Sequence, residues 1–188
     1  ISDHPLNQFK DVFEEYKIVN FNKFSQDPDT SETNIAATLL KIQEKKTQKG
    51  NSYAIIKLTD LSSVFELFIF SDILEFNREV LKEGNSLLLT ISKNLSDEEN
   101  RFKRINVKKI SSLKNLFNQP IFNVEIFLKN SNAIEKVEKI LSKNGETQVK
   151  INILDKKDNF IFNLKNKRFV DRKNLNLLKN QGISANIL

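Results

Sequence analysis

Two alternating stretches decide the fold: Tyr53-Ala54-Ile55-Ile56-Lys57-Leu58 and Val64-Phe65-Glu66-Leu67-Phe68-Ile69-Phe70. Successive side chains of a strand point to opposite faces, so each stretch predicts a strand with one apolar face and one mixed face. The predicted inner faces carry Ala54, Ile56, Leu58, Phe65, Leu67 and Ile69. The outer faces then carry Tyr53, Ile55, Lys57, Glu66 and Phe68, with Phe70 on the outer face or at the rim.

The segments around this pair predict a small barrel. Further strands are expected over residues 34–44, 86–92 and 102–110, with a helix over 71–84 and a glycine-containing turn over 45–51. The order strand, strand, strand, helix, strand, strand within residues 34–112 predicts an OB-fold. This five-stranded Greek-key barrel binds oligonucleotides on its second and third strands and on its loops.

A second pattern follows residues 111–118, which are interpreted as a linker or short helix. Strands are expected over 121–128, 147–154 and 160–170, helices over 131–143 and 171–180, and an edge strand over 183–188. This β-α-β-β-α order predicts a small α+β domain over residues 119–188. Residues 1–33 are predicted to form an N-terminal helix, over residues 6–16, and a linker. The C-terminal domain resembles protein-docking modules, although its charge leaves nucleic acid open as a partner.

The positive charge is unevenly distributed. Residues 119–188 hold 13 basic and 7 acidic side chains, whereas residues 1–118 hold 17 of each. Within the first part, basic residues gather around the first turn and on the last barrel strand, where they would attract phosphate. Outward rings beside cations suit single-stranded nucleic acid, because bases stack on rings and cations follow phosphates. The predicted nucleic-acid-binding residues are Lys41, Lys45, Lys46, Lys49, Tyr53, Ile55, Lys57, Phe68, Arg101, Lys103 and Arg104.

A second interpretation of these residues stays open. Lysines scattered through a Lys- and Asn-rich chain are often merely solvated. The rings could also be covered by the N-terminal segment or by the second domain.

Several residue types are missing. The chain has no cysteine, which excludes disulfides and thiol chemistry and fits a reducing cytosol. It has no methionine and begins with isoleucine, which favours a piece cut from a longer polypeptide. No apolar run approaches the roughly 20 residues of a membrane span. No phosphate-binding glycine loop, paired histidines or catalytic triad is present, and His4 is the single histidine. We therefore expect a binding module with no catalytic residues, no metal ligands and no cofactor.

The order of motifs resembles the alpha subunit of bacterial DNA polymerase III. Ser2-Asp3-His4-Pro5-Leu6 resembles the Ser-Gly-His-Pro-Leu segment that follows the fingers region in that family. Residues 47–60, from Thr47 to Asp60, resemble the family's barrel signature, and Phe65-Glu66-Leu67-Phe68-Ile69-Phe70 resembles its next strand. The chain departs from the family pattern at Asp3, Tyr53, Ile55 and Thr59, where the family has glycine, methionine-like, phenylalanine-like and glutamate residues.

The resemblance implies a role in DNA replication. In that family the OB domain contacts single-stranded template DNA, and the C-terminal domain docks the clamp-loader tau subunit within the polymerase holoenzyme. The parent protein would be a cytoplasmic DNA-directed DNA polymerase, a nucleotidyltransferase. Its catalytic aspartates lie upstream, so this chain alone is not expected to polymerise DNA, and Mg²⁺ is expected only at that absent site. A repair-type paralogue is not distinguished from the replicative enzyme.

Two alternatives of other classes also stay open. One is an OB-fold module that binds RNA, such as a tRNA anticodon domain. The other is an OB scaffold used only for protein interaction.

Overall fold

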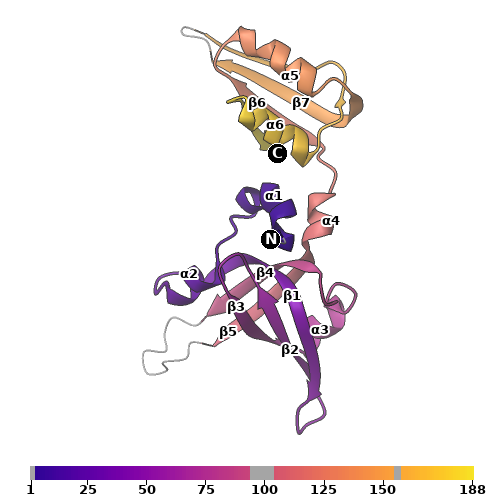
Figure 1. The fold of residues 1–188 in the computed structure, drawn as a ribbon. Helices are drawn as coiled ribbons and strands as arrows, with labels where there is room; N and C mark the ends of the chain where they lie inside the picture. Colours follow the sequence, from indigo (N-terminus) through magenta and orange to yellow (C-terminus); the bar gives the residue numbers. More distant parts are fainter. Residues whose placement is uncertain (1–2, 94–103, 155–157) are drawn as a thin grey trace. The chain divides into compact units, whose positions relative to one another are not determined.

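The computed structural model describes residues 3–93, 104–154 and 158–188. The chain forms two compact units, Ile1–Phe117 and Asn118–Leu188 (Figure 1). The first unit holds a closed barrel with the strand order β1-β2-β3-β5-β4. Its strands are β1 (Glu32–Lys46), β2 (Ser52–Thr59), β3 (Val64–Phe70), β4 (Ser86–Lys93) and β5 (Ile105–Ser112), with helix α3 (Ser71–Asn77) between β3 and β4. The predicted five-stranded OB-type barrel is confirmed.

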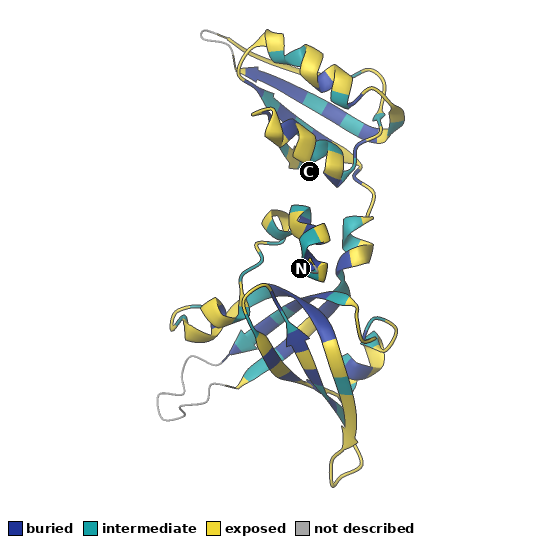
Figure 2. Ribbon diagram, viewed as in Figure 1, coloured by how far each residue is buried: buried dark blue, intermediate teal, exposed yellow. Residues whose placement is uncertain are grey.

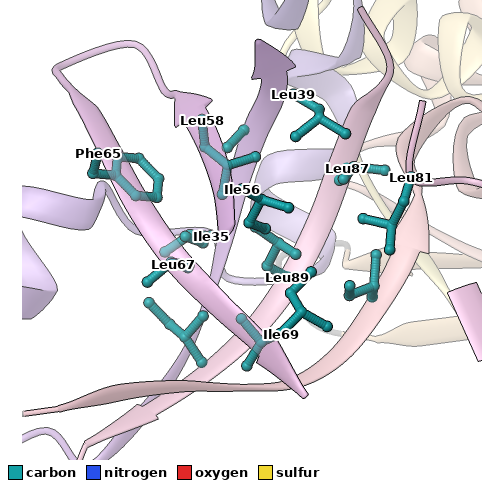
Figure 3. Packing of buried hydrophobic residues seen from close by; sticks show 14 of the residues in the cluster. Ile35, Leu39, Ile56, Leu58, Phe65, Leu67, Ile69, Leu81, Leu87 and Leu89 are labelled. Carbon is teal, nitrogen blue, oxygen red and sulfur yellow. The ribbon is translucent and has the colours of Figure 1, made fainter. Parts of the chain in front are cut away.

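The barrel core follows the predicted alternation. All six residues assigned to the inner faces of β2 and β3 are buried, and Figure 3 shows five of them packed with Ile35 and Leu39 of β1 and Leu87 and Leu89 of β4. Helix α3 is shorter than predicted, because the chain turns after Asn77, whose carbonyl accepts hydrogen bonds from the Val80 and Leu81 amides. This turn brings Leu81 into the core, and Gly84 (φ +89°) then leads the chain into β4.

The N-terminal segment packs on the barrel in three short helices. A 3₁₀ helix η1 (Pro5–Phe9) and helix α1 (Lys10–Glu15) replace the single helix predicted over residues 6–16. Helix α2 (Phe21–Gln26) forms where a loop was predicted. Leu6, Phe9 and Val12 make a second apolar cluster with β1, β4 and helix α4 (Leu113–Phe117). The outer surface of β4 and of the first half of β1 is therefore covered.

Two buried polar groups hold α2 against the barrel. The Asp60 carboxylate accepts hydrogen bonds from the amides of Phe21, Ser62 and Ser63 at 2.7 Å each. The Lys93 ammonium donates to the carbonyls of Phe24, at 2.5 Å, and Asp27. It also lies 4.5 Å from the centre of the Phe24 ring. Both anchors join residues far apart in the sequence.

The second unit is a four-stranded sheet with the order β8-β7-β6-β9. It contains β6 (Asn123–Leu128), η2 (Ser131–Ala133), α5 (Ile134–Ile140), β7 (Asn144–Leu154), β8 (Asn159–Asn163), α6 (Arg172–Asn180) and β9 (Ser184–Ile187). Strands β6 and β7 are parallel and joined through α5, whereas β8 and β9 are antiparallel to their neighbours. Side chains of α5 and α6 pack on alternate residues of β6 and β7 to form the core.

The strand predicted over residues 160–170 is wrong in length, because β8 ends at Asn163. Beyond Leu164 the chain pairs with β7 only through isolated bridges at Arg168. Gly145 permits the close approach that follows: a Cβ at this position would lie 2.5 Å from the Phe169 Cα. Among the described residues, no helix is long and apolar enough to cross a membrane.

Candidate nucleic-acid interface

Three cross-strand rows of side chains lie on the outer face of β1, β2 and β3. The strand registers place these residues directly opposite one another: Lys45, Tyr53 and Phe70 in the first row, Gln43, Ile55 and Phe68 in the second, and Lys41, Lys57 and Glu66 in the third. Directly opposed residues of antiparallel strands share a face and lie about 4.5–5.5 Å apart at Cβ. We call this nine-residue surface the outer platform.

A β-bulge in β1 puts three side chains on the platform. Leu39 pairs with Leu58, whereas Lys41 pairs with Lys57, so Leu40 is the extra residue. An extra residue reverses the inward and outward alternation beyond it. Lys41, Gln43 and Lys45 therefore face outward, while Leu39 before the bulge stays in the core.

Aromatic rings on the platform are open to solvent. Phe68 and Phe70 are each 45% exposed, although large apolar side chains are usually buried. Tyr53 and Ile55 are half-buried beside them. The Arg104 guanidinium carbon lies 4.8 Å from the centre of the Phe70 ring. An exposed ring next to a cation can stack with a base while the cation meets the adjacent phosphate.

Lys41 and Lys57 form an unfavourable pair at the third row. They lie directly opposite each other, and like charges in that position destabilise a sheet. Both are exposed, and neither makes an ion pair within the part of the chain that the structure describes. A bound phosphate would relieve this repulsion. Glu66 beside Lys57 keeps the platform from being uniformly positive.

Other predicted residues lie elsewhere. Lys46 pairs with Ser52 and points to the opposite face of the β1–β2 hairpin from Lys45 and Tyr53. Lys49 lies in the exposed turn at the tip of that hairpin, which extends beyond the barrel (Figure 2). Arg101 and Lys103 lie outside the described residues. The structure thus brings together Lys41, Lys45, Tyr53, Ile55, Lys57, Phe68 and Arg104.

Three platform residues, Phe70, Gln43 and Glu66, are missing from the sequence-based binding set, as is Asn106 of β5, which pairs with Phe68. The alternation already placed Glu66 outward, and Phe70 outward or at the rim, but neither was included in that set. Gln43 and Asn106 depend on the bulge and on a parallel pairing across the barrel, which no local pattern indicates.

The back of the hairpin is held by an ion-pair group. Arg78 contacts Glu75 at 2.9 Å and Glu44 at 2.6 Å. The hydrogen bond to Glu75, followed by that to Glu44, raises the pKa of Arg78 above its usual range. Glu44 lies on the face opposite the platform, since it pairs with the inward residue Ala54. The carboxylates of Glu44 and Glu75 are therefore kept away from Lys45.

The barrel and its exposed outer platform define a domain of the OB class. The chain is a distant homologue of bacterial DNA polymerase III subunit alpha over 76% of its length. It is 28% identical over 149 residues to that subunit from Rickettsia bellii, and 26% identical over 149 residues to that from Rickettsia felis. It spans only 12% of the length of these relatives. No family model matches the chain.

Two solved structures also show similarity. The yeast (S. cerevisiae) mitochondrial single-stranded DNA binding protein Rim1 aligns with a TM-score of 0.35 and 14% identity, covering 45% of this chain and 95% of Rim1. A Replication Protein A heterotrimer bound to single-stranded DNA aligns with a TM-score of 0.37 and 17% identity, covering 72% of this chain and 32% of that structure.

Proposed function

We propose that this chain is the C-terminal region of a cytoplasmic bacterial DNA polymerase III alpha subunit. Its barrel binds single-stranded template DNA on the outer platform, and its second unit docks the clamp-loader tau subunit within the replication holoenzyme. The observation that carries the DNA-binding role is the first row of the platform, in which Lys45 and half-buried Tyr53 lie beside exposed Phe70, with the Arg104 guanidinium over the Phe70 ring. Distant homology to the alpha subunit supports the replicative context.

The platform is well placed for a flexible strand. Neighbouring rows are two residues apart, or about 6.6 Å along the strand. Single strands bind through base stacking on rings, which contributes about 1–3 kcal/mol per base, together with cations along the backbone. The helices η1 and α1 pack on β1 and β4, and α2 contacts β3 at the inward residue Phe65. The outward rings of Phe68 and Phe70 stay exposed.

The test is fluorescence anisotropy of a labelled single-stranded oligonucleotide, titrated with the chain at several salt concentrations. We expect binding that weakens with salt, with a slope of about −0.7 in log K against log salt for each phosphate contacted. Phe68→Ala and Phe70→Ala should each weaken binding about 5-fold or more, as lost stacking predicts.

Matched controls come from the same elements. Lys45→Ala should weaken binding and reduce the salt slope, whereas Lys46→Ala, on the other face of the hairpin, should change neither. Phe76, 89% exposed on α3, controls for removal of an exposed ring. Equal losses in Lys45→Ala and Lys46→Ala would contradict the platform. Preference for a defined RNA loop over single-stranded DNA would instead favour an RNA-binding module.

The docking role is tested separately by calorimetric titration of the purified tau subunit of the source organism into the chain. Binding that survives loss of DNA binding in Phe70→Ala would support two separate surfaces. An absence of tau binding would refute the docking half and leave the DNA-binding half standing.

A further inference from the structure

The free edge of the second sheet has an unusual composition. Strand β8 is the last strand in the order and pairs only with β7. All five of its residues are exposed, and its centre is Phe160-Ile161-Phe162. Soluble proteins normally protect an edge strand with charges, proline or a covering element, because its open backbone groups recruit other strands. Within the second unit, and among the residues that the structure describes, the centre of β8 has none of these protections.

Apolar side chains lie on both faces of this edge, although Ile161 shares its face with Asn159 and Asn163 and pairs with Asn152. The registers place Phe160 and Phe162 on the helix-covered face, opposite the buried residues Ile153 and Ile151. Ile161 is 62% exposed and points to the other face. Exposed Leu154 lies on that same face, at the end of β7. An added strand would therefore find apolar contacts on alternate sides, as well as backbone hydrogen bonds between them.

The surroundings of the edge are positive. The unit as a whole carries 13 basic against 7 acidic residues over positions 119–188. Lys165 follows β8 after Leu164, is exposed, and makes no ion pair within the described ranges, whereas one exposed acidic residue, Asp158, directly precedes β8. Lys167 is 3.8 Å from Glu146, an exposed and weak pairing. This field would attract an acidic partner and repel a second copy of the unit.

We propose that β8 is a strand-addition site for an extended segment with an apolar centre and acidic flanks. Main-chain hydrogen bonds would supply affinity, the side chains of Phe160, Ile161 and Phe162 would supply contacts on both faces, and the basic flank would select acidic sequences. This site would be the place where the proposed docking role acts. The choice of a peptide as the probe rests on that role.

The direct test uses a fluorescein-labelled peptide, Asp-Asp-Glu-Val-Ile-Val-Glu-Asp-Asp, titrated into the full chain. One control peptide carries methyl groups on the three central amide nitrogens, which blocks strand pairing with little change in composition. A second carries lysine at every acidic position. We expect the acidic peptide to bind and both controls to bind at least about tenfold more weakly.

Matched variants locate the site. Ile161→Lys should weaken peptide binding at least about tenfold. Leu177→Lys introduces the same charge at a residue of α6 that is 51% exposed, and should leave peptide binding unchanged. Circular dichroism melting curves check that both variants fold. Equal affinity for the methylated peptide, or no binding of the acidic peptide, would overturn the proposal.

Four further outcomes separate the alternatives. Dimers in sedimentation velocity that Ile161→Lys dissociates would assign the edge to a second copy and overturn the proposal. Displacement of the peptide by oligo-dT, together with loss of DNA binding in Ile161→Lys, would assign the edge to nucleic acid. This outcome would also overturn the proposal. Tau binding that Ile161→Lys leaves intact, together with no peptide binding, would refute the strand edge but keep tau docking. Peptide binding without tau binding would refute tau docking but keep the strand-addition site.

Discussion

Asp60 links two parts of the first unit through one carboxylate. It is 4% exposed and accepts hydrogen bonds at the start of α2 and in the turn between β2 and β3. Burial alone would raise the pKa of Asp60, but the hydrogen bonds from Phe21, Ser62 and Ser63 outweigh it and lower the pKa. The folded state therefore favours the ionised form of Asp60.

We expect Asp60→Asn to lower the free energy of unfolding at pH 7 by about 1–3 kcal/mol, because the new amide cannot accept from Phe21 and the other donors at once. The native pKa is lower than the unfolded one, so the stabilisation is present above about pH 3.9 and is lost as the pH falls through the native pKa. The difference in free energy of unfolding between wild type and Asp60→Asn should thus narrow below about pH 4. Urea unfolding at pH 7, 5 and 3 measures it, and a gap that is the same at all three pH values would contradict the assignment.

Helix α2 depends on the barrel more than on its own residues. It is a six-residue helix without a side-chain N-cap, and short helices are marginal in water. The barrel supports both of its ends: the Asp60 carboxylate accepts from the Phe21 amide at the start, and the Lys93 ammonium donates to the carbonyls of Phe24 and Asp27 at the end. Phe21 adds a stacked contact with Phe65, with ring centres 3.8 Å apart. This explains why local pattern alone predicted a loop.

We expect Lys93→Met to loosen α2 while the barrel stays folded. Removing the ammonium leaves two carbonyls without this donor and costs about 1–3 kcal/mol. Hydrogen exchange by mass spectrometry should show faster exchange for residues 21–30 and unchanged exchange for β2 and β3. Lys23→Met, at an exposed position of the same helix, is the control. Unchanged exchange in α2 would show that the lysine is not its anchor.

The whole molecule has two independent sets of core residues. Among the described residues, two apolar clusters lie within the first unit and one within the second. Each unit therefore has the buried apolar surface that a cooperative transition requires. The platform belongs to the first unit and the β8 edge to the second.

We expect the two units to unfold separately. Ile56→Ala in the barrel core and Ile126→Ala in the second core should each cost about 2–5 kcal/mol. Each variant should shift only one of two transitions in differential scanning calorimetry, and Ile126→Ala should leave single-stranded DNA binding at 20 °C unaltered. A single transition that moves in both variants would contradict independent folding.

Much of this molecule was predictable from local pattern. The alternation of β2 and β3 identified their inner residues and most of the outer ring and cation positions, because side-chain direction along a strand depends only on neighbouring residues. The lengths of helices and strands were less predictable. Helix α3 ends early because Leu81 must reach the core, and strand β8 ends early because Arg168 bridges back to β7. Such requirements come from distant residues.

Composition and short-range periodicity were enough to predict the barrel, the four-stranded second unit and the uneven charge. Which lysines share a face with the rings depends instead on the pairing of the strands in three dimensions. The bulge at Leu40 turns Lys41 and Lys45 toward Tyr53, while the pairing of Lys46 with Ser52 turns that lysine away. Only the sheet order left β8 at an open edge, because strand neighbours are chosen by pairing between segments remote in the chain.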